Sequence, residues 1–217
     1  MARSAVQNLR MRDERREKIL ASALSLFASN GLAATKISQI AARARMSQGL
    51  LYHYYRSKEE IFTELVRSAI GRMNEAARGL EALALRPEEK IGVALTQLMG
   101  HIERDTQFAE HFLLVAQAGV SAAVPVEARA VMEEERSVVY DVFTRIFRAG
   151  QADGSVVDFP AEDLAVVFWT TIKGLALQKA TGPASFRMPD PRIFLRLFLA
   201  GPIPEPDRNV LEREVRG

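Results

Sequence analysis

The sequence predicts an all-α protein, and two observations support this prediction. Apolar residues recur at intervals of three and four along most of the 217 residues, and no stretch shows the sustained alternation typical of a strand. Glycine, proline and asparagine interrupt the helical pattern at intervals. The breaks leave about nine helical segments, in the order of three small helices, a long fourth helix and five more.

The first helix is predicted over 12–30. Its apolar residues form one stripe from Ile19 to Phe27, and Asn30-Gly31 is a typical helix end. A basic segment, residues 1–11, precedes it.

Capping residues mark the starts of the next three helices. Thr35 is the predicted N-cap of the second helix, and Ser47 that of the third, which runs to Tyr55. Ser57 and Glu60 have the spacing of a capping box at the start of the fourth helix. The fourth helix is expected to continue into the low eighties.

Five further apolar-periodic segments follow. The predicted helices are 88–103, 106–118, 126–149, 161–180 and 191–200. The proline-rich and charged residues 202–217 are expected to form a loose tail.

Positive charge is concentrated at the N-terminus. Residues 1–58 hold 11 Lys and Arg against 3 Asp and Glu, a net charge of +8, whereas residues 59–217 hold 18 against 24, a net charge of −6. Attraction to phosphate needs positive charge only where contact occurs, so this division favours a nucleic-acid-binding N-terminal domain. On charge alone, a solvated basic segment is an equal alternative.

The arrangement of the small helices favours a helix-turn-helix, in which the third helix enters the DNA major groove. Met46, Leu51 and Tyr55 are expected to face inward. The opposite side of the third helix is then rich in groups that can contact bases or phosphates, although Tyr54 can alternatively belong to the core. The residues of this side are Ser47, Gln48, Gly49, Leu50, Tyr52, His53 and Tyr54.

The segment ISQIAARARMSQGLLYHYYRSKEEIFTEL, preceded by KILASALSLFASNGLAATK, resembles the DNA-binding domain of the TetR family over about residues 15–65. The resemblance implies phosphate contacts by Thr35 and Lys36, major-groove contacts by the third helix, and a DNA-backbone contact by Lys58. It also implies a homodimeric repressor that binds a palindromic operator and is released by a small-molecule effector.

Two positions depart from the family pattern. Arg45 and Met46 occupy the tight turn where the family commonly has glycine and a small apolar residue. A left-handed Arg45 costs roughly 1 kcal/mol, which a phosphate contact by its side chain can offset. Leu50 replaces a frequent Thr or Ser, so an altered operator preference is expected.

Domain boundaries follow from these assignments. We predict a DNA-binding domain at 1–58 with a basic arm at 1–11, a regulatory and dimerisation domain at 59–201, and a tail at 202–217. The basic N-terminal extension either contacts DNA or is a solvated, disordered arm, and these alternatives stay equal. Its arginines are Arg3, Arg10, Arg12, Arg15 and Arg16.

Two apolar stripes in the C-terminal helices are candidates for the dimer interface, which the resemblance assigns to the last long helices. Either stripe can instead be intramolecular core, the commoner fate of such a pattern. The candidates are Val131, Val138, Val142, Ile146, Leu164, Val167, Phe168, Thr171 and Leu175.

Polar or soft side chains within apolar helices are candidates for an effector pocket. Because the surroundings are apolar, a hydrophobic or aromatic effector is expected. Each residue taken singly is more often a core residue. The candidates are Met99, His101, His111, Phe112, Tyr140 and Trp169.

Other classes of function find little support. The sequence has no cysteine, no HExxH and no glycine-rich phosphate loop, so neither an enzyme, a metal site nor a cofactor is expected. Without an apolar run of membrane-spanning length or a signal peptide, no membrane association and a cytoplasmic location are expected. A helical interaction protein that has lost DNA binding is the alternative function.

Overall fold

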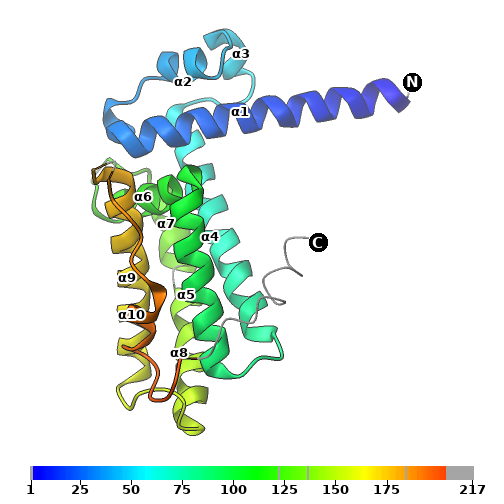
Figure 1. Cartoon of the computed structure of the whole chain (residues 1–217). Helices are drawn as coiled ribbons and strands as arrows, with labels where there is room; N and C mark the ends of the chain where they lie inside the picture. Colours follow the sequence, from blue (N-terminus) through cyan, green and yellow to red (C-terminus); the bar gives the residue numbers. More distant parts are fainter. Residues whose placement is uncertain (1, 122, 136, 184, 204–217) are drawn as a thin grey trace. The chain divides into compact units, whose positions relative to one another are not determined.

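The computed structural model describes residues 2–121, 123–135, 137–183 and 185–203, and their regular structure is helical (Figure 1). Val156 and Leu199 add one isolated antiparallel bridge. These residues confirm the all-α prediction. The helices are α1 (Ala2–Ala34), α2 (Ile37–Arg43), α3 (Gln48–Tyr52), α4 (Lys58–Ala82), α5 (Pro87–Arg104), α6 (Thr106–Val120), α7 (Val126–Glu135), α8 (Ser137–Ala152), α9 (Ala161–Thr181) and α10 (Pro191–Leu195).

Most helix boundaries agree with the sequence. The chief differences are that α1 starts ten residues earlier than the predicted residue 12, and that α3 and α10 are shorter than expected. The predicted helix 126–149 corresponds to α7 and α8, which flank residue 136 outside the described part of the chain. No helix in the described ranges is long and apolar enough to cross a membrane.

The chain forms two compact units, which we call the head unit and the body unit. The head unit consists of the chain up to Arg72 together with α6 and α7. The body unit consists of the remainder of α4 with α5, α8, α9 and α10. The sequence did not predict that α6 and α7 group with the N-terminal helices.

The head unit has one hydrophobic core. Phe27 of α1 and Phe62 of α4 meet edge to face at its centre, with ring centroids 5.4 Å apart. Leu114 of α6 and Ala128 of α7 are fully buried in the same core. The α6–α7 segment is therefore part of the packing that holds the helix-turn-helix together.

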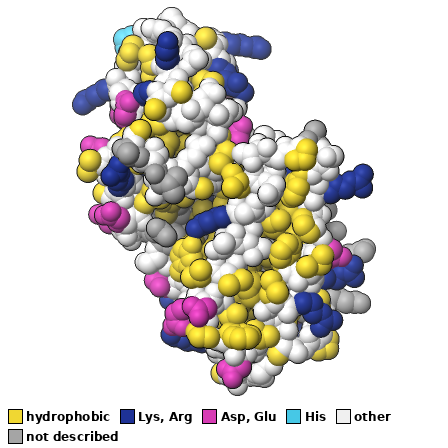
Figure 2. Space-filling view, turned by 90° about the vertical axis from the view of Figure 1, so that its left-hand side faces the viewer, with side chains coloured by type: hydrophobic (Ala, Val, Ile, Leu, Met, Phe, Trp, Pro, Cys, Tyr) yellow, Lys and Arg dark blue, Asp and Glu magenta, His cyan; other side chains and the backbone are white. Residues whose placement is uncertain are grey.

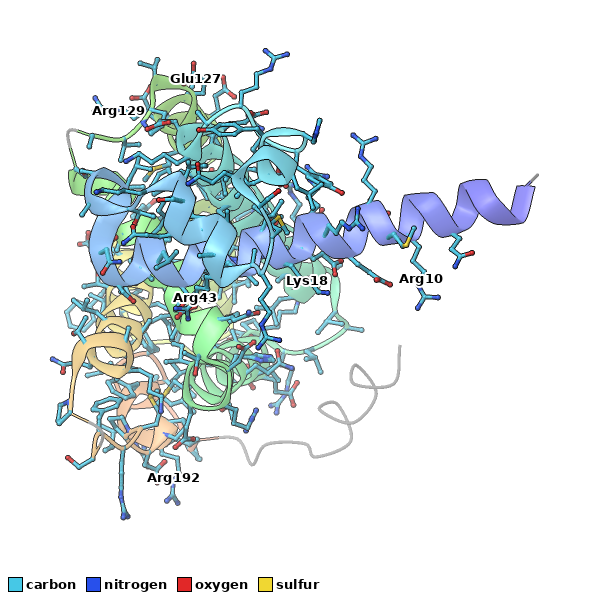
Figure 3. All side chains as sticks on the ribbon, turned by 90° about the horizontal axis from the view of Figure 1, so that it is seen from above. Arg10, Lys18, Arg43, Glu127, Arg129 and Arg192 are labelled. Carbon is cyan, nitrogen blue, oxygen red and sulfur yellow. The ribbon has the colours of Figure 1, made fainter. Side chains whose placement is uncertain are left out.

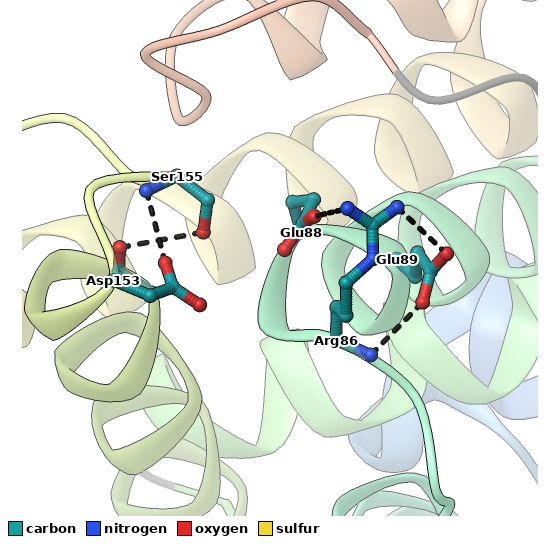
Figure 4. A network of polar contacts seen from close by, with 6 residues as sticks. Arg86, Glu88, Glu89, Asp153 and Ser155 are labelled. Atoms are coloured by element: carbon teal, nitrogen blue, oxygen red, sulfur yellow. Dashed lines mark hydrogen bonds and ion pairs between the residues drawn. The ribbon is translucent and has the colours of Figure 1, made fainter.

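The body unit is built around packed aromatic rings from α8, α9 and the segment after α10. Phe143 and Phe168 stack with centroids 4.3 Å apart, and Phe198 lies 5.8 Å from Phe168. At the start of α5, the Arg86 side chain contacts Glu88 and Glu89, and Glu89 also accepts a hydrogen bond from the Arg86 amide (Figure 4). The hydrogen bonds between Arg86 and Glu89 cap the start of α5, which packs against the end of α8.

Most of the candidate dimer residues are buried in these cores, which favours the intramolecular alternative for them. Apolar residues at helical spacing face the interior of their own protomer as readily as a partner. Val138 and Thr171 are half-buried, and Val167 is exposed. The buried members are Val131, Val142, Ile146, Leu164, Phe168 and Leu175.

A tight contact at Gly150 provides a test of the body packing. A Cβ atom at this position would overlap Val156 Cγ2 and lie 3.1 Å from Pro87 Cβ. Gly150→Ala is expected to lower the free energy of unfolding by about 1–3 kcal/mol, because the end of α8 must move away. Gly79→Ala, in an exposed part of α4 with open space around it, should be neutral or slightly stabilising. Equal unfolding midpoints for the two variants in urea would contradict this packing.

Candidate nucleic-acid interface

The connection from α1 to α2 is held by internal hydrogen bonds. Gly31, with φ 75° and ψ 165°, interrupts the helical backbone of α1 where the sequence predicts its end. The Thr35 side chain is fully buried, and its hydroxyl lies 2.8 Å from the Gly31 carbonyl oxygen. Thr35 is therefore not the N-cap of α2, a position that Lys36 occupies, and its hydroxyl is engaged within the head unit.

Lys58, the first residue of α4, also has an internal role. Its Nζ donates to the carbonyl oxygens of Leu32, Ala33 and Thr35 at distances of 2.8, 3.1 and 2.8 Å. The three bonds occupy all three ammonium hydrogens. In this conformation Lys58 is a clamp between α4 and the end of α1, and its expected contact with the DNA backbone stays a prediction.

Lys36 is placed differently from these two residues. Its side chain is exposed, while its amide donates to Gln39 Oε1 at 2.8 Å and so begins α2. Lys36 therefore keeps the expected position for a phosphate contact.

The turn between α2 and α3 has the strained backbone that the sequence suggests. Arg45 has φ 56°, and among the described residues it is the one non-glycine with a positive φ. The turn is closed by the Met46 amide, which donates to the Ala41 carbonyl at 3.0 Å. The Arg45 side chain is exposed, so the strained residue adds a positive charge beside α3.

The third helix turns its apolar residues inward and its polar residues outward. Ser47 accepts a hydrogen bond from the Leu50 amide at 3.1 Å, which confirms the predicted N-cap. Leu51 and Tyr55 are buried, as predicted, and Met46 is partly buried against the same core. Of the candidate contact residues, Leu50 and Tyr54 are half-buried, and the exposed ones are Ser47, Gln48, Gly49, Tyr52 and His53.

The end of this helix is fixed by a polar contact with α1 and α4. Arg16 Nε donates to Tyr55 Oη at 3.2 Å, and Arg16 Nη2 lies 2.8 Å from Glu64 Oε1. Burial raises the pKa of Tyr55 to about 12, and the hydrogen bond that Arg16 donates to Glu64 is the largest cause of a raised Arg16 pKa. Arg16 is thus a structural residue of the head unit, although it was grouped with the basic extension.

Ser57 begins α4 almost as predicted. Its hydroxyl accepts from the Glu60 amide at 3.2 Å, while the Glu60 carboxylate reaches the Arg56 amide, one residue before the expected partner.

Further basic side chains lie on α1 and α2. Arg10 and Lys18 project from α1 and Arg43 from α2 in Figure 3, and all three are exposed. The residues preceding 12 continue α1 as a helix, and the Arg3 side chain lies outside the described part of the chain. Sequence reasoning missed Lys18 and Arg43, which only the positive net charge of this region indicated.

The candidate pocket residues divide between the two units. Met99 and Phe112 are buried, and His101 is exposed. His111 lies between the Gln107 carbonyl and Arg72 Nη2, at 2.8 and 3.0 Å, and burial lowers its pKa. Within the body unit, the rings of Tyr140 and Trp169 have centroids 6.4 Å apart. No group of three metal-ligating side chains exists in the described ranges.

Comparison with known proteins identifies the same helix-turn-helix segment. Residues 19–65 match the sequence model of a family described as "Bacterial regulatory proteins, tetR family". The HTH-type transcriptional regulator BetI of Rhizobium meliloti (strain 1021) is 28% identical over 153 residues, which cover 70% of this chain and 70% of BetI.

The chain belongs to the TetR family of transcription regulators. The structure of the ketosteroid regulator KstR2 of Mycobacterium tuberculosis superposes with a TM-score of 0.70 at 20% identity, covering 86% of this chain and 96% of KstR2. A transcriptional regulator of Saccharomonospora viridis in complex with choline gives a TM-score of 0.68 at 19% identity, covering 87% and 100%. These structures share the fold, and the family is one of DNA-binding regulators rather than enzymes.

Two lysines of the TetR head should respond differently to substitution. Lys58→Met is expected to lower the free energy of unfolding by about 1–2 kcal/mol, because three carbonyls lose a charged donor. Lys36→Ala should leave stability within about 0.5 kcal/mol of wild type and reduce the salt slope of DNA binding by about 1. Urea unfolding and binding titrations at several salt concentrations measure both effects. A normal stability for Lys58→Met would refute the clamp.

The strained turn gives a second test. Arg45→Gly is expected to raise the free energy of unfolding by up to about 1 kcal/mol, since glycine adopts a positive φ without steric cost. Arg45→Ala keeps the strain but removes the same charge, so both variants should weaken DNA binding alike while only the glycine variant gains stability. If neither variant changes DNA affinity, Arg45 makes no phosphate contact.

Proposed function

We propose that this TetR-family regulator is a repressor that binds a palindromic operator as a homodimer. The observation that carries this proposal is the polar surface of α3, which is capped by Ser47 and held from behind by Leu51 and Tyr55. In this proposal residues 1–58 contact DNA, and residues 59–201 carry dimerisation and effector binding.

The roles of the contact residues follow from their chemistry. Gln48 carries both a donor and an acceptor for base edges, and Tyr52 and His53 offer further polar groups on the same exposed surface. Lys36 before α2 and Arg45 in the turn before α3 supply charges for phosphates. Arg10 and Lys18 on α1 extend the positive surface, which favours DNA contact by the N-terminal extension.

Selection of bound fragments from random DNA by the purified protein tests this proposal. The expected result is enrichment of one palindromic motif, because two heads related by a two-fold axis match two half-sites. Absence of any enriched motif would overturn the proposal and favour the helical interaction protein.

Dimerisation is proposed to use the exposed apolar surface of α9. Val166, Val167 and Leu177 are 52%, 43% and 46% exposed, and a Cβ atom at Gly174, on the same helix, would have no neighbour within 4 Å. Figure 2 faces the side of the body unit that carries α9, and hydrophobic side chains gather there. A second copy of the chain is the proposed occupant, because a palindromic operator requires two-fold symmetry.

A charge on this surface is expected to abolish the dimer. Val166→Glu should yield a monomer in sedimentation velocity and weaken operator binding at least about tenfold, since one head has fewer contacts. Val126→Glu, at a still more exposed valine of α7 (77%), serves as the control and should remain dimeric. A dimeric Val166→Glu protein would place the interface elsewhere.

Release by a small, hydrophobic or aromatic effector is the last part of the proposal. The clustered rings of the body unit, with Tyr140 and Trp169 among them, favour an apolar ligand. Within the head unit, two hydrogen bonds connect α6 to α2 through α1. Arg43 Nη2 of α2 donates to Ser25 Oγ of α1 at 2.9 Å, and Ser25 donates to Glu110 of α6 at 3.0 Å. A displacement of α6 would therefore disturb α2.

A further inference from the structure

We infer that the effector carries a carboxylate, which binds to a donor cluster formed by Trp169, Lys173 and Tyr140 in the body unit. This inference rests on the proposed effector control and names the chemical class of the ligand. Tyr140 and Trp169 are candidate pocket residues from the sequence, and the structure adds Lys173 beside them.

The first member of the donor cluster is the indole N–H of Trp169. The side chain is 3% exposed and is packed by Phe143 and Phe168, with ring centroids 5.2 and 5.5 Å away. Its Nε1 is buried without an acceptor among the described residues. Buried polar groups are almost always hydrogen-bonded, so an indole donor in this position indicates a place where an acceptor from outside the chain binds.

Lys173 places a positive charge one helical turn away on α9. Its Nζ lies 2.8 Å from Tyr140 Oη and 5.3 Å from the centroid of the Tyr140 ring. Among the described residues, Lys173 forms no ion pair with a carboxylate. When Lys173 donates to the phenol oxygen, the phenol hydrogen stays available as a further donor.

These groups select an anion. The ammonium, the phenol O–H and the indole N–H are donors that have no anionic acceptor among the described residues, and a carboxylate is the acceptor that suits such donors. The surrounding rings provide apolar contact for a hydrocarbon attached to that carboxylate. An amphipathic monocarboxylic acid combines both features.

The same cluster argues against a quaternary ammonium effector. Aromatic rings alone can enclose such a cation, and a structural neighbour binds choline. Here the Lys173 ammonium already lies beside the Tyr140 ring, so a second cation would meet like charge at short range. The donor cluster therefore distinguishes this chain from a choline-binding protein.

The single tryptophan of the sequence provides a direct test. Trp169 fluorescence is titrated with decanoate, 1-decanol and decyltrimethylammonium, which share a ten-carbon chain and differ in head group, all below their micelle concentrations. Decanoate is expected to give a saturable change and to bind at least about tenfold more tightly than either analogue. Equal binding of decanol, or tighter binding of the ammonium compound, would overturn the inference.

Two lysine substitutions on α9 distinguish binding at the donor cluster from a general effect of positive charge. Lys173→Met should reduce decanoate affinity at least about tenfold while decanol affinity stays within about twofold. Lys179→Met removes the same charge from another half-exposed position of α9 and should behave as wild type. A Lys173→Met protein that is folded, dimeric and unimpaired in decanoate binding would contradict the assignment, as would one whose sole defect is loss of the dimer.

Measuring operator affinity in the same samples distinguishes the proposed carboxylate site from the proposed release of the operator by an effector. If decanoate binds with the expected selectivity but leaves operator affinity unchanged, the carboxylate site stands and effector-controlled release is refuted. If another ligand releases the operator and decanoate does not bind, the carboxylate inference alone is refuted.

Discussion

The three hydrogen bonds from the Lys58 ammonium to Leu32, Ala33 and Thr35 are the constraint on which the DNA-binding surface depends. They join the start of α4 to the end of α1 and the start of α2. A lysine in the first turn of a helix is disfavoured by the helix dipole unless its charge is engaged elsewhere, as it is here. Because α3 follows α2 after one tight turn, the clamp sets where the polar side of α3 points.

A second consequence concerns the extent of the DNA-binding unit. Leu114 and Ala128 are buried in the same core as the helix-turn-helix, and Gln117 of α6 donates to the Ala28 carbonyl at 3.1 Å. The α6–α7 segment therefore moves with the head in any change that keeps this core intact. A displacement of α6 would reach the DNA-binding surface through packed side chains and the Ser25–Glu110 hydrogen bond.

Local features of the site could be predicted from sequence, whereas features that depend on distant residues could not. Ser47 and Ser57 were identified as caps because their partners lie three residues away. The internal hydrogen bonds of Thr35 and Lys58 depend on a fold that brings separate helices together, so the sequence did not predict them. On α9, apolar residues lie on the buried and the exposed sides alike, as Phe168 and Val167 show, and periodicity cannot separate core from interface.

The central claim is that the exposed surface of α3 reads operator sequence. The most direct measurement compares the motif selected from random DNA by wild type with that selected by Gln48→Ala, since Gln48 is exposed and the cap of α3 is formed by Ser47. Relaxed preference at one base position in each half-site, with the rest of the palindrome retained, is the predicted result. An unchanged motif bound with wild-type affinity would contradict the account.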